Sequence, residues 1–421
     1  MKRTTSTTLA CVFAVLQFAG CAADAGDDGS TRSLGPRLTA EPDLRLGSVD
    51  DPDQNFTRLE SVVIGPAGEI IVADAQANMV RIYGEDGRPL RTVGAPGSGP
   101  GHFESLQRVA LRGDTLLAFD GQPFVSAFTL DGTYQRSVWR PGERWMFARE
   151  GPTGLRFMYL PTAPEALIGD TSAITMPNVG YSPGPLDCTP GVADFVLPRP
   201  YFRVGTNGSI ADTLLWSEDT NRTLTLTNGG ATYRWRVPFM RKNFFGMLPE
   251  GQGILIADET PADEAGIAAI HLTALSPRRD TLWRRELPVS PIPSAPEHVV
   301  AAALRTPPIF VEACSGDASA TAAMPTPEQI ATAYRDSDGA LPDLPALTGL
   351  HVGQDGSIWL RREESAPDST AWQRLDPNGE PLGFLRLPVG QRVIAANGDV
   401  FLTTETDELD VPYLVRYRLA D

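Results

Sequence analysis

A short phrase that recurs along the chain constrains the fold more than any other feature of the sequence. A turn glycine precedes an apolar run that often ends in aspartate, at residues 68–74 (GEIIVAD), 113–120 (GDTLLAFD), 253–258 (GILIAD), 356–361 (GSIWLR) and 398–403 (GDVFLT). Each copy is short, rich in β-branched or aromatic residues, and bounded by turn residues, which is typical of a β-strand. The phrase therefore predicts a fold built from many short strands.

A second phrase follows most copies at similar spacing. It alternates apolar and polar residues and then reaches Asp-Gly or Asn-Gly, at residues 80–87 (VRIYGEDG), 125–132 (VSAFTLDG) and 372–379 (WQRLDPNG). These dipeptides favour tight hairpin turns, and another strand follows, as at residues 89–93. Strands joined by hairpins and repeated with a period of tens of residues predict an all-β protein, a β-propeller.

Six blades are expected from the repeats. The first five cover residues 59–94, 103–140, 145–218, 230–290 and 346–388.

The sixth blade starts near Val393 and reaches Arg418, after which the chain has no room for an outermost strand. Residues 43–49 (DLRLGSV) precede the first blade and are expected to supply that strand. Such an N-terminal strand closes the last blade and removes two open sheet edges.

Residues 291–345 match the repeat poorly and are predicted to form an insertion between blades. The segment 326–334 (TPEQIATAY) begins with a helix-capping pattern and proline at the first helical position. One short helix is expected in this insertion.

The glycine-rich loop at residues 94–104 (GAPGSGPGHFE), between two copies of the strand phrase, resembles the loops that open blades in NHL-repeat propellers. The chain is similar to bacterial six-bladed β-propeller lipoproteins related to NHL proteins. This resemblance implies an NHL/TolB-like propeller. It is carried by the first two blades, whereas the third and fourth match only in their hairpin phrases.

The N-terminus has the organisation of an export signal. Lys2 and Arg3 precede the apolar residues 9–18, which are too few to span a bilayer. Residues 18–21 (FAGC) resemble the lipobox of bacterial lipoproteins, in which the cysteine, here Cys21, is acylated. The alternative is an ordinary secretory signal with an incidental cysteine.

The expected organisation is therefore a signal peptide at residues 1–20, a flexible tether at residues 21–42 and the propeller at residues 43–421. Ala22 stands where an inner-membrane retention signal carries aspartate, so the expected location is the cell envelope, lipid-anchored in the outer membrane.

Two cysteines, Cys188 and Cys314, remain once the signal and the lipidated residue are set aside. An even pair in an oxidising compartment indicates one disulfide. Two free thiols are the alternative.

The charge balance excludes a general nucleic-acid binder. The chain has 52 acidic and 36 basic residues, a net charge of −16, and loss of Lys2 and Arg3 with the signal gives −16 − 2 = −18. A protein that binds phosphate backbones needs a basic surface instead.

Asp74, Asp120 and Asp258 recur at the end of a propeller strand and are candidates to line one rim and bind a cation or cationic group. The alternative is that each carboxylate accepts backbone hydrogen bonds in the turn that follows. His102 resembles a histidine that helps to ligate zinc in the NHL-like peptide-amidating lyases. A catalytic zinc needs about three protein ligands, and the other blade openings carry no equivalent histidine.

The sequence therefore favours a binding or scaffolding module, without a cofactor, for an envelope protein, peptide or glycan. The alternative is a metal-dependent hydrolase or lyase that holds Ca or Zn in the central channel, with His102 and the rim aspartates as candidate ligands.

Overall fold

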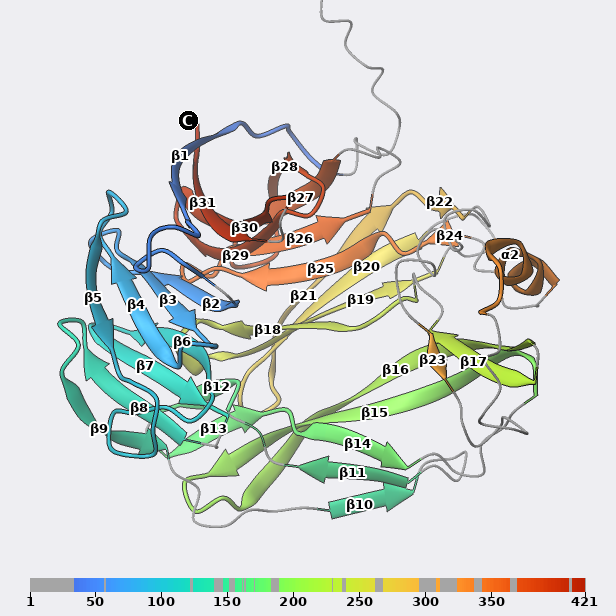
Figure 1. The fold of residues 1–421 in the computed structure, drawn as a ribbon, viewed down its shortest axis with the longest axis horizontal. Coiled ribbons are helices and arrows are strands. Elements are labelled where there is room, and N and C mark those ends of the chain that lie inside the picture. Colours follow the sequence, from blue (N-terminus) through green and yellow to red (C-terminus); the bar gives the residue numbers. More distant parts are fainter. Residues whose placement is uncertain are drawn as a thin grey trace, which may run out of the picture.

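The described residues fold almost entirely into antiparallel β-sheets (Figure 1). The structure, a computed structural model, describes residues 34–56, 58–121, 124–139, 147–150, 156–160, 162, 164–169, 171–182, 189–228, 230–236, 240–261, 268–294, 308–310, 324–336, 343–363, 369–408 and 411–420. The signal peptide, Cys21, Cys188 and Cys314 lie outside these residues. In the part of the chain that is described, no helix is long and apolar enough to cross a membrane.

Four sheets contain four strands each, in chain order, as the hairpin phrases predict. The first two sheets are β2 (Leu59–Ile64), β3 (Ile70–Asp74), β4 (Met79–Tyr83), β5 (Pro89–Val93), and β6 (Leu106–Arg112), β7 (Thr115–Asp120), β8 (Phe124–Thr129), β9 (Tyr134–Trp139). The other two are β18 (Phe244–Leu248), β19 (Gly253–Thr260), β20 (Ala268–Leu275), β21 (Thr281–Val289), and β25 (Leu347–Val352), β26 (Ile358–Arg362), β27 (Ser369–Leu375), β28 (Pro381–Pro388). Apolar side chains pack between neighbouring sheets, such as Val80 with Phe128 in the cluster between the first and second.

The sheet between the second and fourth differs most from the prediction. Its six strands lie in the order β12 (Ala166–Ile168), β13 (Ser172–Thr175), β15 (Gly191–Gly205), β16 (Ile210–Asn228), β17 (Ala231–Arg236) and β23 (Ile309–Phe310). Because β15 has 15 residues and β16 has 19, the two strands run far past the sheet and form an arm (Figure 1).

The predicted boundary between the third and fourth blades is therefore wrong. Residues 231–236 pair with β16, from Asn228 opposite Ala231 onward, and the fourth sheet begins only at Phe244. The physical reason is that a hairpin looks the same in sequence whether it lies inside a blade or extends an arm. Only the pairing partners distinguish the two.

A small sheet covers part of the arm. It contains β10 (Phe147–Glu150), β11 (Arg156–Leu160) and β14 (Asn178–Ser182). Tyr159 is fully buried, and its hydroxyl donates to the carbonyl of Pro198 at 3.1 Å. The ring of Tyr159 meets Trp216 edge to face at 5.9 Å.

The predicted helix is present as α2 (Pro327–Asp336). A reciprocal pair of hydrogen bonds fixes its start, since the amide of Gln329 donates to Thr326 Oγ1 and the amide of Thr326 donates to Gln329 Oε1. Ile330 is buried against the arm in a cluster with Leu224 and Trp235. The two ends of the insertion meet through β22 (Ile292–Pro293) and β24 (Asp343–Leu344).

The last sheet contains both ends of the described chain. Its order is β1 (Ala40–Leu46), β31 (Pro412–Leu419), β30 (Val400–Thr406) and β29 (Arg392–Asn397), and β1 is antiparallel to β31. This strand lies at residues 40–46, three residues earlier than the predicted 43–49.

Residues 34–42 belong to the predicted tether, and several of them contact the sheets. Leu34 is 3% exposed and lies in a cluster with Ala371 and Phe384. The amide of Phe384 donates to the carbonyl of Pro36 at 2.9 Å, and the amide of Leu38 donates to the carbonyl of Phe384 at 2.6 Å. The segment therefore binds β28 before it enters the last sheet as β1.

Asp43 on β1 binds the two arginines of β31 that connect the last sheet to the first. Its carboxylate accepts from Arg416 Nε at 2.8 Å and from Arg418 Nε at 2.7 Å, and Arg418 also pairs with Glu85 in the turn between β4 and β5 at 2.8 Å. Burial raises the pKa of Asp43, but the hydrogen bonds and charges of the two arginines outweigh it and hold the pKa below its usual 3.8.

Replacing Asp43 with alanine should lower the free energy of unfolding by about 1–2 kcal/mol, because its three partly exposed hydrogen bonds to Arg416 and Arg418 are lost. Since the pKa is lowered in the folded state, the contribution is present above the ordinary carboxyl pKa and lost as the pH falls through the lowered one. Urea unfolding at pH 7 and pH 3 would measure both effects. The exposed Asp50→Ala is the matched control, and equal stability of the two variants at pH 7 would contradict the assignment.

Candidate functional site

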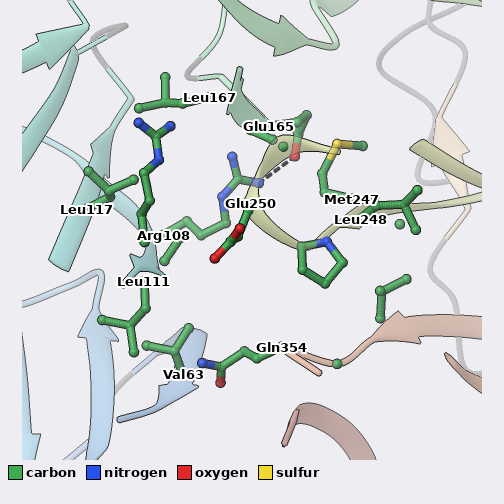
Figure 2. Close-up of a pocket in the computed structure, with 18 of the residues that line it drawn as sticks. Val63, Arg108, Leu111, Leu117, Glu165, Leu167, Met247, Leu248, Glu250 and Gln354 are labelled. Atoms are coloured by element: carbon green, nitrogen blue, oxygen red, sulfur yellow. Dashed lines mark hydrogen bonds and ion pairs between the residues drawn. The ribbon is translucent and has the colours of Figure 1, made fainter. Parts of the chain in front are cut away.

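One cavity of about 620 Å³ lies where the first strands of the sheets meet. Residues of β2, β6, β12, β18 and β25, the first strands of five sheets, line it together with Asn397 of β29, the edge strand of the last sheet opposite β1. Figure 2 shows these side chains converging from several sheets. The volume is in the range of small-molecule sites, about 300–1,000 Å³.

The cavity owes its size to the short first strand of the third sheet. β12 has three residues, whereas β2 has six and β6 has seven. Because β12 is short, it leaves side chains of strands farther out in this sheet in contact with the cavity, including Tyr201 of β15.

Most of the wall is apolar. Val63, Leu111, Leu117, Leu167, Met247 and Leu248 surround the space in Figure 2. The charged side chains of the wall are those of Arg108, Arg112, Glu165 and Glu250, and Glu250 is exposed to solvent.

Arg108 on β6 bridges the second and third sheets across the cavity wall. Its guanidinium pairs with Glu165 at 2.5 Å, donates to the carbonyl of Pro164, and lies over the ring of Phe119 at 4.8 Å from the centroid. Its charge is thus already neutralised by Glu165.

Gln354, in the turn after β25, joins three sheets at one end of the cavity. Its side-chain oxygen accepts from the amide of Ile64 at 2.7 Å, and its side-chain nitrogen donates to the carbonyl of the same residue at 2.9 Å. Its own amide donates to the carbonyl of Ala396 at 2.8 Å. The glutamine therefore links the ends of β2, β25 and β29.

His351 on β25 lines the cavity as a neutral ring. Burial lowers its pKa to about 4, and the charge of Asp355 opposes this shift only in part. The imidazole is therefore uncharged at neutral pH.

Glu250 differs from the other polar groups of the cavity. It lies in η2 (Pro249–Gly251), the turn between β18 and β19, in a left-handed conformation with φ 54° and ψ 21°. The turn lies so close to β12 that a Cβ on Gly251 would collide with the carbonyl of Leu167.

The carboxylate of Glu250 projects into the cavity (Figure 2). Among the described residues, it has no hydrogen-bond or ion-pair partner.

The candidate rim aspartates lie elsewhere. Leu59 pairs with Asp74 and Leu106 with Asp120, so these carboxylates lie at the start of β2 and β6, whereas the cavity adjoins the far ends of those strands.

Both aspartates have internal partners. Asp74 accepts from the amide of Ala77 at 3.2 Å, in the following turn, and from Arg81 Nε at 3.0 Å. Asp120 instead accepts two amides of the preceding loop, of Glu104 and Ser105, each at 2.8 Å.

Asp258 and His102, the other two predicted site residues, do not lie beside Asp74 and Asp120. Burial raises the pKa of Asp258, against the influence of His271, which lies opposite it on β20. His102 is exposed, and its Nδ1 lies 3.1 Å from the place that a Cβ on Gly97 would occupy, in its own glycine-rich loop. None of the four predicted residues lines the cavity, and their role in ligand binding remains a prediction.

Sequence reasoning missed Arg108, Glu250 and Gln354. None belongs to a repeated phrase with chemical meaning, and the Pro-Glu-Gly at residues 249–251 indicates only a turn. No group of three or more His, Cys, Asp or Glu side chains suited to a metal ion occurs within the described ranges.

The fold and the cavity define an all-β protein of propeller type, with sheets arranged around one central space. The sequence matches no protein-family model and no curated protein.

Several solved structures are similar in overall shape. A member of the DUF4221 family from Bacteroides vulgatus is 8% identical with a TM-score of 0.43, over 91% of this chain and 98% of that one. An exported protein from Bacteroides fragilis is 10% identical with a TM-score of 0.38, over 91% and 96%. Virginiamycin B lyase from Staphylococcus aureus is 10% identical with a TM-score of 0.34, over 91% and 100%. At these TM-scores, none of them indicates what this chain binds.

Replacing His351 with glutamine should make stability less dependent on pH. With its pKa lowered to about 4 in the folded state and 6.5 as the ordinary value, His351 binds a proton first in the unfolded state. The protein should therefore lose stability as the pH falls from 6.5 to 4. Chemical unfolding across this range gives the free energy of unfolding as a function of pH. This free energy should fall less steeply with decreasing pH in His351→Gln than in the parent protein. Identical pH dependences would show that the ring is accessible to protons.

Proposed function

We propose that the chain is a closed six-bladed propeller of NHL type that acts as a binding module, with the central cavity as its site. Strands of six sheets around one space support the blade number. The pairing of β1 with β31 and the Asp43–Arg418–Glu85 bridge support closure between the last blade and the first.

The observation that carries the binding role is how the cavity's polar groups are used. Arg108, Glu165 and Gln354 bind one another or the backbone across sheet boundaries, and His351 is neutral. These groups hold the wall in place and leave a preformed, mainly apolar space, which suits the apolar part of a ligand. A peptide side chain or the apolar portion of another envelope molecule would fit this description.

The metal-dependent alternative is less well supported. Its candidate ligands Asp74 and Asp120 are used by Arg81 and by backbone amides, at the strand ends away from the cavity.

The neutral dye N-phenyl-1-naphthylamine tests the binding role, since its fluorescence rises in apolar surroundings. The protein should bind it with one-site behaviour, and Ala166→Phe, which fills the cavity wall, should weaken binding by about tenfold or more. Ala193→Phe on the exposed arm is the control and should bind as the parent does. Melting curves confirm that both variants fold, and a dye response unaffected by Ala166→Phe would refute the cavity as the site.

We propose further that the propeller is a lipoprotein of the cell envelope. Its lipid anchor is attached to Cys21, and the residues between Cys21 and Leu34 connect the anchor to the propeller. The lipobox-like FAGC at residues 18–21 supports this location. Replacing Cys21 with serine should move the protein from the membrane fraction to the soluble fraction, because acyl chains supply about 0.8 kcal/mol of membrane affinity for each buried CH₂. Fractionation and immunoblotting would show this, and unchanged membrane association would contradict lipid anchoring.

A further inference from the structure

We propose that the cavity selects ligands that join an apolar body to a positively charged amine, and that Glu250 recognises the amine. This inference rests on the proposed binding function and specifies the ligand class of that site.

The first observation is the placement of Glu250. Its backbone has the left-handed conformation at φ 54° and ψ 21°, which residues with side chains seldom adopt. The close approach of Gly251 to the carbonyl of Leu167 holds the turn against β12. Two sheets thus fix the position from which the carboxylate enters the cavity.

The second observation is the charge distribution around the cavity. Two arginines line the cavity: Arg108 is paired with Glu165 at 2.5 Å and also donates to the carbonyl of Pro164, and Arg112 donates to the carbonyl of Gly169 at 3.2 Å. Glu250 has no such partner in the described part of the chain. Its carboxylate is the acceptor that a cationic ligand would find on entering.

The third observation is the apolar wall around this carboxylate, with Val63, Leu111 and Met247 among its residues. The carboxylate at a fixed position complements a cationic group, and the apolar wall of the cavity complements an apolar body attached to that group. A divalent metal ion would prefer about six oxygen ligands, and the apolar wall offers no such set. An anionic ligand would meet the repulsion of Glu250.

Three probes with the same eight-carbon chain separate the charge from the apolar body: n-octylamine, 1-octanol and octanoate. Each is titrated at pH 7 against the protein loaded with N-phenyl-1-naphthylamine, whose displacement reports binding. We expect n-octylamine to bind about tenfold more tightly than 1-octanol, and octanoate to bind more weakly than both.

Glu250→Gln removes the charge and keeps the length of the side chain. In this variant, n-octylamine should bind no more tightly than 1-octanol, whereas the affinity for 1-octanol should stay within about twofold of the parent value. The matched control is Asp399→Asn, an exposed acid in the turn between β29 and β30, at the same end of the sheets but outside the cavity wall. It should retain the preference for the amine.

The outcomes distinguish this inference from the proposed function. If 1-octanol displaces the dye but the amine gains no advantage, or if Glu250→Gln keeps that advantage, the role of Glu250 is refuted and the cavity remains a binding site. If neither the dye nor any probe binds, the proposed binding function itself fails. Loss of the amine preference in Asp399→Asn as well would assign it to the general acidity of the surface.

Discussion

The antiparallel pairing of β1 with β31 is the contact on which the rest of the architecture depends. Without it, the last sheet would have three strands with β31 at its edge, and the two ends of the described chain would be free to separate. Residues 34–38 bind β28 before β1 joins β31, and Asp43 holds Arg416 and Arg418, which donate to Glu85 of the first sheet. One N-terminal segment thus joins three neighbouring sheets.

The cavity is a consequence of unequal strand lengths in otherwise similar sheets. The short β12 leaves space that a strand of ordinary length would fill, and β15 and β16 of the same sheet run outward into the arm. The ion pair of Arg108 with Glu165 and the hydrogen bonds of Gln354 with Ile64 then connect neighbouring sheets around the cavity. The site we propose is therefore located at the least regular of the repeated units.

Much of the fold could be predicted because its signals are local. The first two sheets and α2 agree with the predicted segments, since turn glycines, alternating strands and the capping pair at Thr326 and Gln329 act within a few residues. The arm and the start of the fourth sheet were misassigned, since pairing across tens of residues decides them. Glu250 was missed because its setting is created by β12 and the η2 turn together, more than eighty residues apart in sequence.

The sequence by itself determined the class of fold, the short strands and their hairpins and the acidic charge, and it predicts an export signal at the N-terminus. Each of these follows from composition or from neighbours along the chain. Only the tertiary structure decided that Asp74 and Asp120 are used internally while Glu250 projects into a shared cavity. The reason is that the role of a carboxylate depends on which donors surround it, and those donors come from distant segments that meet only when the sheets assemble.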